Sequence, residues 1–334
     1  MLGWNIFADL ISGTILFAVP LLLVALGGMF SERSGTINIA LEGIMIIGAL
    51  AGSLFLRAVN MSIQGVPGNP QLIMLAAILF SGLVGGLFSL LLAFAAINLK
   101  ADQTIGGTAL NMIAPAFAVV LAWTIQGQGQ TTIYLPNWLA IKPENFGLVA
   151  SEAPGFFERV IFKSFYLTTP IAILILIASV IIYSRTRFGL RLRSCGEHPQ
   201  AADSLGINVY KMRYIGVAIS GVLAGIGGLA FTVAAGSGFQ SDVAGYGFLG
   251  LAVMIFGNWK PLRIFFAALF FALFKTLSGL ASSIPFLPSF EGIKNAQYIY
   301  LMLPYIVTMV VLALTSKTSR APKAEGIPYD KGLR

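Results

Sequence analysis

Residues 10–30 read LISGTILFAVPLLLVALGGMF, an uncharged run of apolar and small residues between Leu10 and Phe30. A helix of about 20 such residues crosses the ~30 Å hydrocarbon core of a bilayer. The run is longer than the apolar part of a cleavable signal peptide, and no Lys or Arg precedes it in residues 1–10. It therefore predicts a membrane-spanning helix that remains in the protein.

Runs of the same kind recur along the whole chain. Hydrophobic residues make up 57% of the 334 residues and charged residues only 10%, with a mean hydropathy of +0.85. Because about a quarter of the residues in a soluble protein are charged, a soluble globular chain is excluded. We predict an all-α, polytopic transmembrane helical bundle of about nine spans, at residues 11–29, 36–56, 71–97, 105–124, 165–184, 214–236, 244–257, 264–284 and 297–314. The 244–257 segment is too short and too Gly-rich for a regular crossing, so we expect a broken or re-entrant helix there.

Lys and Arg are distributed unevenly between the two sides of this bundle. Fifteen of them fall in segments on the same side as loop 185–213, and five fall on the other side. The remaining one, Lys275, falls within a span, where we expect it to be paired or to snorkel. Because cytoplasmic loops carry the excess of positive charge, we expect the C-terminus in the cytoplasm and the N-terminus outside a bacterial plasma membrane. Residues 1–315 then form a single transmembrane domain and 316–334 a cytoplasmic tail.

The chain lacks the residue clusters of an enzyme or a metal protein. Cys195 and His198 are its only cysteine and histidine, which excludes a disulfide framework and a four-ligand zinc site. No paired carboxylates or nucleophile–base set mark catalysis, and the cations flank apolar spans instead of forming a basic face for nucleic acid. We therefore expect no catalytic residue, metal ligand or cofactor in this chain, and no nucleic-acid partner. Because the chain has no G-x-x-x-x-G-K-[ST] phosphate loop, ATP-driven work would need a separate ATPase chain.

The 185–213 loop contains the signals of a short helix. Pro199 suits a first helical position, and Gly206 suits a left-handed C-terminal cap. Ala201, Ala202 and Leu205 are spaced to form one small apolar face. A helix this short is marginal in water and needs a surface to pack against. That surface is either a groove on a partner protein or the lipid headgroups, and the residues alone favour neither.

Three separated parts of the chain carry a resemblance to a known family. They are GLRLR, GEHPQAA and LGI within 189–207, SERSGTINIALEG at 31–43, and GYGFLGLAVMIFGNWKPL at 245–262. They resemble the permeases of bacterial ABC importers for ribose, branched-chain amino acids and nucleosides, and within that family the guanosine and general nucleoside permeases. The resemblance runs from about residue 10 through 321–324, although Asn258 and Trp259 stand where the family usually has an Arg after Gly257.

The resemblance implies a non-enzymatic transport subunit that forms a translocation path for nucleosides with a second permease, either another copy or a paralogue. It also implies that a cytoplasmic ABC ATPase holds the Mg-ATP and that an extracellular or periplasmic binding lipoprotein delivers the solute. The residues implied to dock on the ATPase are Gly196, Glu197, His198, Pro199, Ala201, Ala202, Leu205 and Gly206. Two alternatives stay open. One is a permease of the same type for a sugar, riboflavin or a branched-chain amino acid, and the other is a secondary transporter driven by an ion gradient.

Two Gly-rich membrane elements, Gly35–Gly43 and Gly245–Gly257, occur once in each half of the chain. Broken helices in transporters present backbone groups to the solute, and the pairing suggests an internal repeat. Asn38 and Glu42 are four residues apart and would share one face of a helix. That face either lines the solute path, or Glu42 bonds to a neighbouring span or to Arg33. We favour the bond for Glu42 and leave Asn38 open.

Further polar residues are candidates for the solute path. Asn111 lies within an apolar span and either contacts solute or bonds to another helix. Gln240 and Asp242, beside the outer end of the sixth span, lie either in an external vestibule or in a solvated loop. The 125–164 segment is either an outer docking surface or a cap over the helix ends. Three G-x-x-x-G motifs, at 48–52, 82–86 and 221–225, predict close helix packing.

Overall fold

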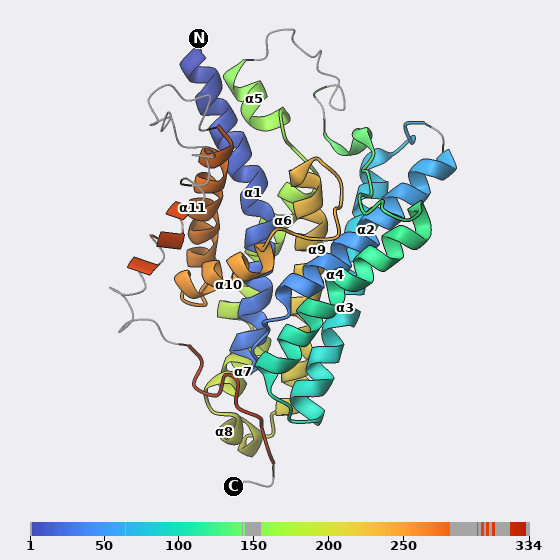
Figure 1. Cartoon of the computed structure of the whole chain (residues 1–334). Helices are drawn as coiled ribbons and strands as arrows, with labels where there is room; N and C mark the ends of the chain where they lie inside the picture. Colours follow the sequence, from blue (N-terminus) through green and yellow to red (C-terminus); the bar gives the residue numbers. More distant parts are fainter. Residues whose placement is uncertain are drawn as a thin grey trace.

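The computed structural model describes residues 2–63, 65–141, 143, 155–280 and 321–331, together with single helical positions between 299 and 310. Within these residues the chain is all-α, with one isolated antiparallel bridge between Ile133 and Phe239. Figure 1 shows a helical bundle with the N-terminus at one end and the short helices α7 and α8 at the other. The predicted fold class is confirmed.

The long helices correspond to the predicted spans. The elements are α1 (Leu2–Arg33), α2 (Leu41–Ile63), α3 (Pro70–Ala93), η1 (Phe94–Asn98), α4 (Gln103–Gln126), η2 (Asn137–Leu139), α5 (Phe156–Phe162), α6 (Thr168–Arg185), α7 (Arg187–Glu197), α8 (Pro199–Ser204), α9 (Val209–Ala235), α10 (Tyr246–Phe256) and α11 (Pro261–Leu280). Among the described residues, seven helices are long and apolar enough to cross a membrane: α1, α2, α3 with η1, α4, α6, α9 and α11. The predicted span at 297–314 lies largely outside the described residues.

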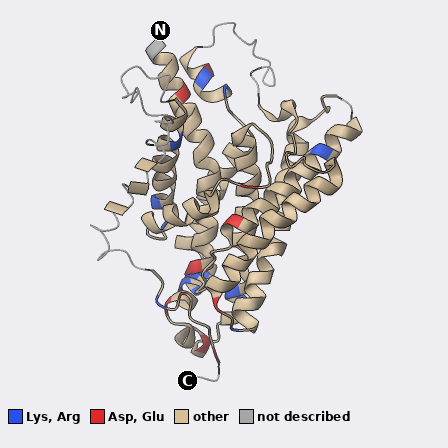
Figure 2. Cartoon of the chain, viewed as in Figure 1, with Lys and Arg blue, Asp and Glu red and all other residues tan. Residues whose placement is uncertain are grey.

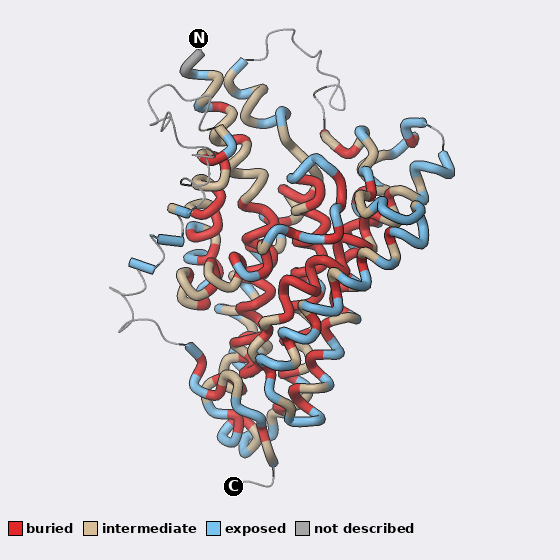
Figure 3. The backbone as a smooth tube through the Cα atoms, in the orientation of Figure 1, coloured by how far each residue is buried: buried red, intermediate tan, exposed pale blue. Residues whose placement is uncertain are grey.

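Helix α9 is the central element of the bundle and packs against α1, α2 and α3. It is buried along most of its length, as the tube in Figure 3 shows. Glycines allow this close approach: a Cβ on Gly48 would lie 2.4 Å from the Gly225 Cα, and one on Gly228 would lie 2.0 Å from the Met45 carbonyl oxygen. The Ser81 hydroxyl of α3 lies 2.7 Å from the carbonyl oxygens of both Gly48 and Gly225. Glycines of all three G-x-x-x-G motifs lie in these contacts, and the close helix packing predicted for the motifs is observed.

Helix α10 is the short membrane element that the sequence predicts at 244–257. It contains 11 residues and starts after Gly245, which has a φ of +77°. It packs against α1, α2 and α11. A helix of this length rises only about 16 Å, so it cannot cross a bilayer.

The described part of the 125–164 segment covers helix ends. Trp138 donates its indole N–H to the Asn60 side chain at 3.1 Å, and Ile133 exchanges two backbone hydrogen bonds with Phe239. Leu139 is also buried. These contacts favour the cap over the docking surface for the described residues.

Charged residues are sparse along the bundle and gather mainly at the end that holds α7 and α8, as Figure 2 shows. Because a charge inside hydrocarbon is costly, this distribution is the one expected of helices that cross a membrane.

Candidate functional site: the α7–α8 turn and the broken membrane helices

Helices α7 and α8 form a helical turn between the spans α6 and α9. Thr186 caps α7 by accepting a hydrogen bond from the Gly189 amide at 3.1 Å. Gly189 also permits the sharp bend after α6, since a Cβ there would lie 2.1 Å from the Ile182 carbonyl oxygen. Pro199 takes the first position of α8, and Gly206 follows it with a φ of +79°. The predicted short helix is confirmed, and α7 is a second helix beside it.

The eight residues expected to dock on an ATPase are divided between two sides of this turn. The exposed ones are His198, Ala201, Leu205 and Gly206, whereas Gly196, Pro199 and Ala202 are buried and Glu197 is half-buried. Ala201, Ala202 and Leu205 all line one groove on the turn, so the apolar face predicted for them is observed. Ala202 is the buried member of this face, at 2% exposure.

A groove of about 690 Å³ opens between α7 and α8. Leu190 and Leu205 line it and are 62% and 83% exposed, and Arg187 and Arg191 line its α7 side. Exposed apolar residues rimmed by polar ones are typical of a protein interaction site. Leu190 is not among the docking residues predicted from the sequence. The signal that could have found it is the i, i+3, i+4 spacing of Arg187, Leu190 and Arg191, which places all three on one helix face.

The buried side of the turn rests on the end of α1. A Cβ on Gly196 would lie 2.4 Å from the Arg33 carbonyl oxygen, so only glycine fits this contact. The Arg33 guanidinium pairs with the Glu197 carboxylate at 3.4 Å. Arg33 and Arg193 also lie 5.8 Å and 4.9 Å from the centre of the Tyr183 ring. These contacts join α7 directly to the end of α1.

Residues 321–331, which we call the C-terminal strap, lie across the same end of the bundle. The Ala324 amide donates to the Gly196 carbonyl oxygen at 2.8 Å. Arg213 of α9, only 1% exposed, donates to the Ile327 carbonyl oxygen at 2.9 Å. The strap therefore connects the end of α7 to the start of α9.

Side chains of the strap add to these contacts. Tyr329 is buried and packs its ring against Tyr210, with 5.3 Å between ring centres. Asp330 forms an ion pair with Lys100 at 2.5 Å, beyond the end of η1. Burial raises the pKa of the Glu325 carboxyl. These contacts extend the strap from α9 to the connection between η1 and α4.

Residues 34–40 form a break between α1 and α2, and side chains from other helices satisfy its backbone. The Asn111 side chain of α4 accepts a hydrogen bond from the Gly43 amide at 2.7 Å and donates one to the Ile39 carbonyl oxygen at 2.8 Å. Irregular backbone is tolerated at membrane depth only when protein or water satisfies it. Asn111 thus has the helix–helix bonding role, one of its two predicted roles.

Asn38 lies inside the break and outside any helix, because α2 begins only at Leu41. The prediction that Asn38 and Glu42 share a helix face is therefore wrong. The physical reason is Gly35, whose φ of +95° turns the backbone away from the helical path after α1. Asn38 is fully buried and donates to the Ser220 hydroxyl at 2.8 Å, while its carbonyl oxygen has no partner among the described residues.

Glu42 joins the two broken elements. Its carboxylate accepts hydrogen bonds from the amides of Gly245 at 2.9 Å and Gly247 at 2.6 Å, in the first turn of α10. A helix N-terminus presents free amides and a partial positive charge, so a carboxylate is favourable there. Gly247 leaves room for this contact, since a Cβ would lie 2.3 Å from the Glu42 nitrogen. The favoured bond of Glu42 to a neighbouring element is thus observed, and Arg33 is not its partner.

Gln240 and Asp242 are both exposed in the linker between α9 and α10. Phe239 beside them is buried and anchors the linker through its bridge to Ile133. An exposed position fits both the external vestibule and the solvated loop, so a role of either residue in the solute path stays a prediction.

The sequence analysis missed several polar residues that shape the break. Gln103 accepts a hydrogen bond from the Ile37 amide at 2.7 Å. Glu32, buried near the end of α1, accepts one from the Trp259 indole N–H at 2.6 Å. Trp259 is one of the two residues at which the sequence departs from the resembled family. No local periodicity signals such long-range pairs.

Comparisons with known proteins agree with this geometry. The family described as the permease component of the branched-chain amino acid transport system matches residues 10–312. The chain is 43% identical to the guanosine ABC transporter permease protein NupQ of Bacillus subtilis, over 99% of both chains. It is 40% identical to the nucleoside ABC transporter permease protein NupC of Lactococcus lactis, over 98% of both chains.

A more distant relative comes from the same Lactococcus organism. The nucleoside ABC transporter permease protein NupB is 25% identical to the chain, over 92% of this chain and 83% of that protein. No solved structure matches the chain. The family match spans most of the sequence, and two relatives match it nearly from end to end. The chain therefore belongs to the family of permease components of branched-chain amino acid transport systems.

Proposed function

We propose that this chain is the membrane-spanning permease subunit of a nucleoside importer driven by a separate ABC ATPase. The observation that carries the proposal is the α7–α8 turn. Its outer side is an exposed apolar groove, and its inner side is fixed to the end of α1. This is the arrangement needed to receive a force from a second protein and pass it into the bundle.

The groove favours a protein over lipid headgroups as the surface that α8 contacts. A hollow of about 690 Å³ needs a projecting group to fill it, and a flat headgroup layer offers none. Leu190 and Leu205 would contact apolar side chains of the ATPase. Arg187 and Arg191 would face acidic ones, since charges of opposite sign across an interface favour the correct partner.

Movement at the turn reaches the broken membrane elements through direct contacts. Gly196 and Glu197 hold the end of α1, α1 leads into the break at 34–40, and Glu42 after the break holds α10. ATP-driven closure of the ATPases would displace α7 and α8 and switch these elements between outward and inward access. Mg-ATP belongs to the ATPase in this proposal, and the permease holds no cofactor and leaves the solute chemically unchanged.

The proposal includes a second permease subunit and an external binding lipoprotein. Helix α4 presents apolar side chains that other parts of the described chain leave uncovered, with Ile105 at 70% and Met112 at 76% exposure. They are available to lipid or to the second permease. NupC and NupB, two nucleoside permease proteins of one organism, support a paralogue as the second permease. The excess of Lys and Arg around α7 and α8 supports a cytoplasmic location for that end, with the N-terminus outside.

The names of NupQ and NupC support a nucleoside as the solute. The buried side-chain carbonyl oxygen of Asn38 has no partner among the described residues, and it would contact the solute in a conformation that opens the break. Gln240 and Asp242 would form part of the external vestibule. A sugar, riboflavin or a branched-chain amino acid is the alternative solute. An ion-driven transporter needs intramembrane carboxylates as ion sites, and Glu42 is committed to the amides of α10, which favours ATP as the energy source.

The test is uptake of labelled guanosine by cells that express the chain with its ATPase and binding lipoprotein, with unlabelled nucleosides, ribose, riboflavin and leucine as competitors. We expect competition by nucleosides alone. Leu205→Asp should abolish uptake and co-purification of the ATPase, whereas Met61→Asp, at a 66% exposed position at the far end of α2, should change neither. Competition by ribose or riboflavin would reassign the solute, and normal values for Leu205→Asp would remove the docking role. Uptake that an uncoupler stops, but that persists without the ATPase, would establish the ion-driven alternative.

A further inference from the structure

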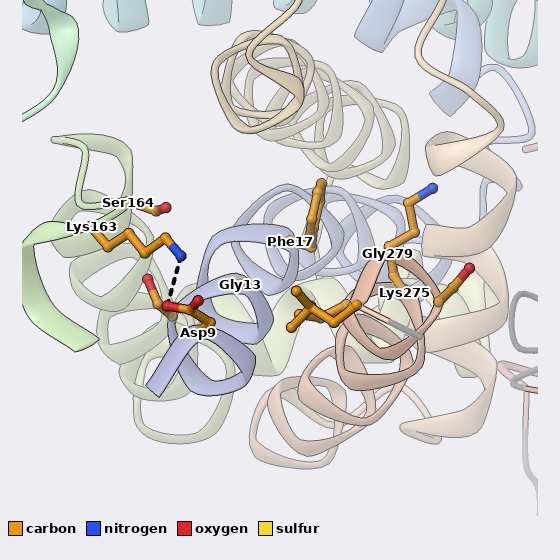
Figure 4. Close-up of a pocket in the computed structure, with 11 residues that line it drawn as sticks. Asp9, Gly13, Phe17, Lys163, Ser164, Lys275 and Gly279 are labelled. Atoms are coloured by element: carbon orange, nitrogen blue, oxygen red, sulfur yellow. Dashed lines mark ion pairs between the residues drawn. The ribbon is translucent and has the colours of Figure 1, made fainter. Parts of the chain in front are cut away.

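Two adjoining cavities that share Ser12 and Ser164 lie at the end of the bundle away from α7 and α8, where α1, α5, α6 and α11 meet, and we call the pair the amphipathic cavity. Its polar part has a volume of about 430 Å³ and is lined by Asp9, Lys163 and Lys275 (Figure 4). Ser12 and Ser164 line this part and also a neighbouring apolar part of about 500 Å³. The apolar part is lined by Val19, Leu22, Ile173, Leu176 and Leu269, among others.

The polar part carries a surplus of positive charge. Lys163 pairs with Asp9 at 2.7 Å. Lys275 is half-buried within α11 and forms no ion pair with any residue that the structure describes. Figure 4 places the two lysines on either side of Phe17, both at the cavity. Among the residues that the structure describes, two lysines and one aspartate leave one positive charge without a counter-ion. A cation within a span is costly unless it has a partner.

The apolar part requires an occupant of a different kind. A cavity with few polar partners holds water poorly, and in a bilayer the neighbouring hydrocarbon chains are available to fill it. One ligand then has to present an anion at Lys275 and an apolar chain between α1, α6 and α11. A free anion such as phosphate satisfies the first requirement and leaves the second unmet.

We propose that this cavity binds one anionic phospholipid, with its phosphate at Lys275 and an acyl chain in the apolar part. Ser12 and Ser164 line both parts and would lie beside the glycerol or ester region of the lipid. The bound lipid would hold α5 and α6 against α1 and α11. The site is independent of the solute and of the ATPase.

The charge requirement is tested by lipid retention. The full chain, purified with any subunits that accompany it, is placed in nanodiscs of equal phosphatidylglycerol and phosphatidylcholine with identical acyl chains, and retained lipid is counted by native mass spectrometry. We expect phosphatidylglycerol to be retained preferentially. Lys275→Gln should lower its retention about fivefold, the effect of one cation near a lipid surface, and Lys275→Arg should preserve it. Lys260→Gln, at an exposed position at the opposite end of α11, is the matched control and should have no effect.

The acyl-chain requirement is tested by filling the apolar part. Ile173→Trp should reduce retention because Ile173 lines the cavity, whereas Leu174→Trp, at an exposed neighbour that does not line it, should not. Both are exposed residues, so neither change should prevent folding, and only variants with a monodisperse size-exclusion peak are compared. Equal retention of the two lipids, or no effect of Lys275→Gln, would overturn the proposal. Displacement of the lipid by inorganic phosphate, with no effect of Ile173→Trp, would show a simple anion site instead.

Discussion

Replacement of Glu42 tests the contact between the two broken membrane elements. Its carboxylate accepts two amide hydrogen bonds, at 2.9 Å from Gly245 and 2.6 Å from Gly247. A hydrogen bond to a charged group is worth about 1.5–3 kcal/mol. In Glu42→Gln the new NH₂ group cannot accept, so one bond is lost and the other loses its charge. We therefore expect Glu42→Gln to lower stability by about 2–3 kcal/mol, and Glu42→Ala, which removes both acceptors, by roughly twice that.

Glu197→Gln is the matched control, since it makes the same chemical change at a side chain that is 42% exposed and 3.4 Å from Arg33. A long ion pair with one partly exposed partner contributes about 1 kcal/mol. The assay is thermal unfolding of the purified variants in one detergent, followed by loss of the monodisperse size-exclusion peak. For a chain of this length, the apparent melting temperature of Glu42→Gln should fall by roughly 3–4 °C and that of Glu197→Gln by less than about 1.5 °C. Equal shifts, or no shift for Glu42→Gln, would refute the assigned role of Glu42.

Three further predictions concern other parts of the bundle. A Cβ on Gly228 would lie 2.0 Å from a carbonyl oxygen of α2, so Gly228→Val should yield no monodisperse protein. Gly68→Ala, where a Cβ would meet open space, should give the normal yield. A normal size-exclusion peak for Gly228→Val would contradict the packing of α9 against α2. Burial raises the pKa of the Cys195 thiol to about 11, so maleimide labelling should stay slow from pH 7 to 9 in the folded protein and become fast after denaturation. Because the pKa of this thiol is higher in the folded protein than in the unfolded protein, its contribution to stability is present at neutral pH and is lost as the pH rises toward 11. Maleimide labelling that is equally fast in folded and denatured protein would disprove the burial of Cys195. Burial also raises the pKa of Glu325, so docking of the C-terminal strap is favoured by protonation and weakens as the pH rises through that pKa. The rate of trypsin cleavage within the strap, normalised to the rate on a peptide substrate, should increase with pH. Glu325→Gln should remove this increase. An unchanged pH profile in this variant would argue against Glu325 as the group that controls docking of the strap.

Much of the fold follows from local features of the sequence. The length of each uncharged run predicts a span, because a helix needs a fixed number of residues to cross the hydrocarbon. Pro199 and Gly206 locate α8, because each residue restricts or permits a particular backbone angle. The Gly-rich 244–257 segment predicts the short α10, because glycine permits the backbone angles that interrupt a helix. These signals lie within a few residues of the structure they determine.

The remaining features depend on contacts between distant parts of the chain. Glu42 bonds to amides about two hundred residues away, and no periodicity reports such a pair. Arg213, counted in the sequence as a loop cation, is buried beneath the C-terminal strap. The burial of Ala202 depends on which side of α8 meets the bundle. The position of Asn38 depends on Ser220 of α9, which accepts its hydrogen bond.

The central claim is that the outer side of the α7–α8 turn contacts the ATPase, and site-specific cross-linking tests it most directly. Cys195, the chain's only cysteine, is replaced by Ser, and a single cysteine is introduced as Leu205→Cys or, as the control, Met61→Cys. Each variant is labelled with benzophenone-maleimide in a complex that retains ATP-dependent uptake, and is then irradiated. The account predicts an adduct between the permease and the ATPase for Leu205→Cys, with a yield that changes when ATP is added, and none for Met61→Cys. A transport-competent complex without this adduct at Leu205→Cys would contradict it.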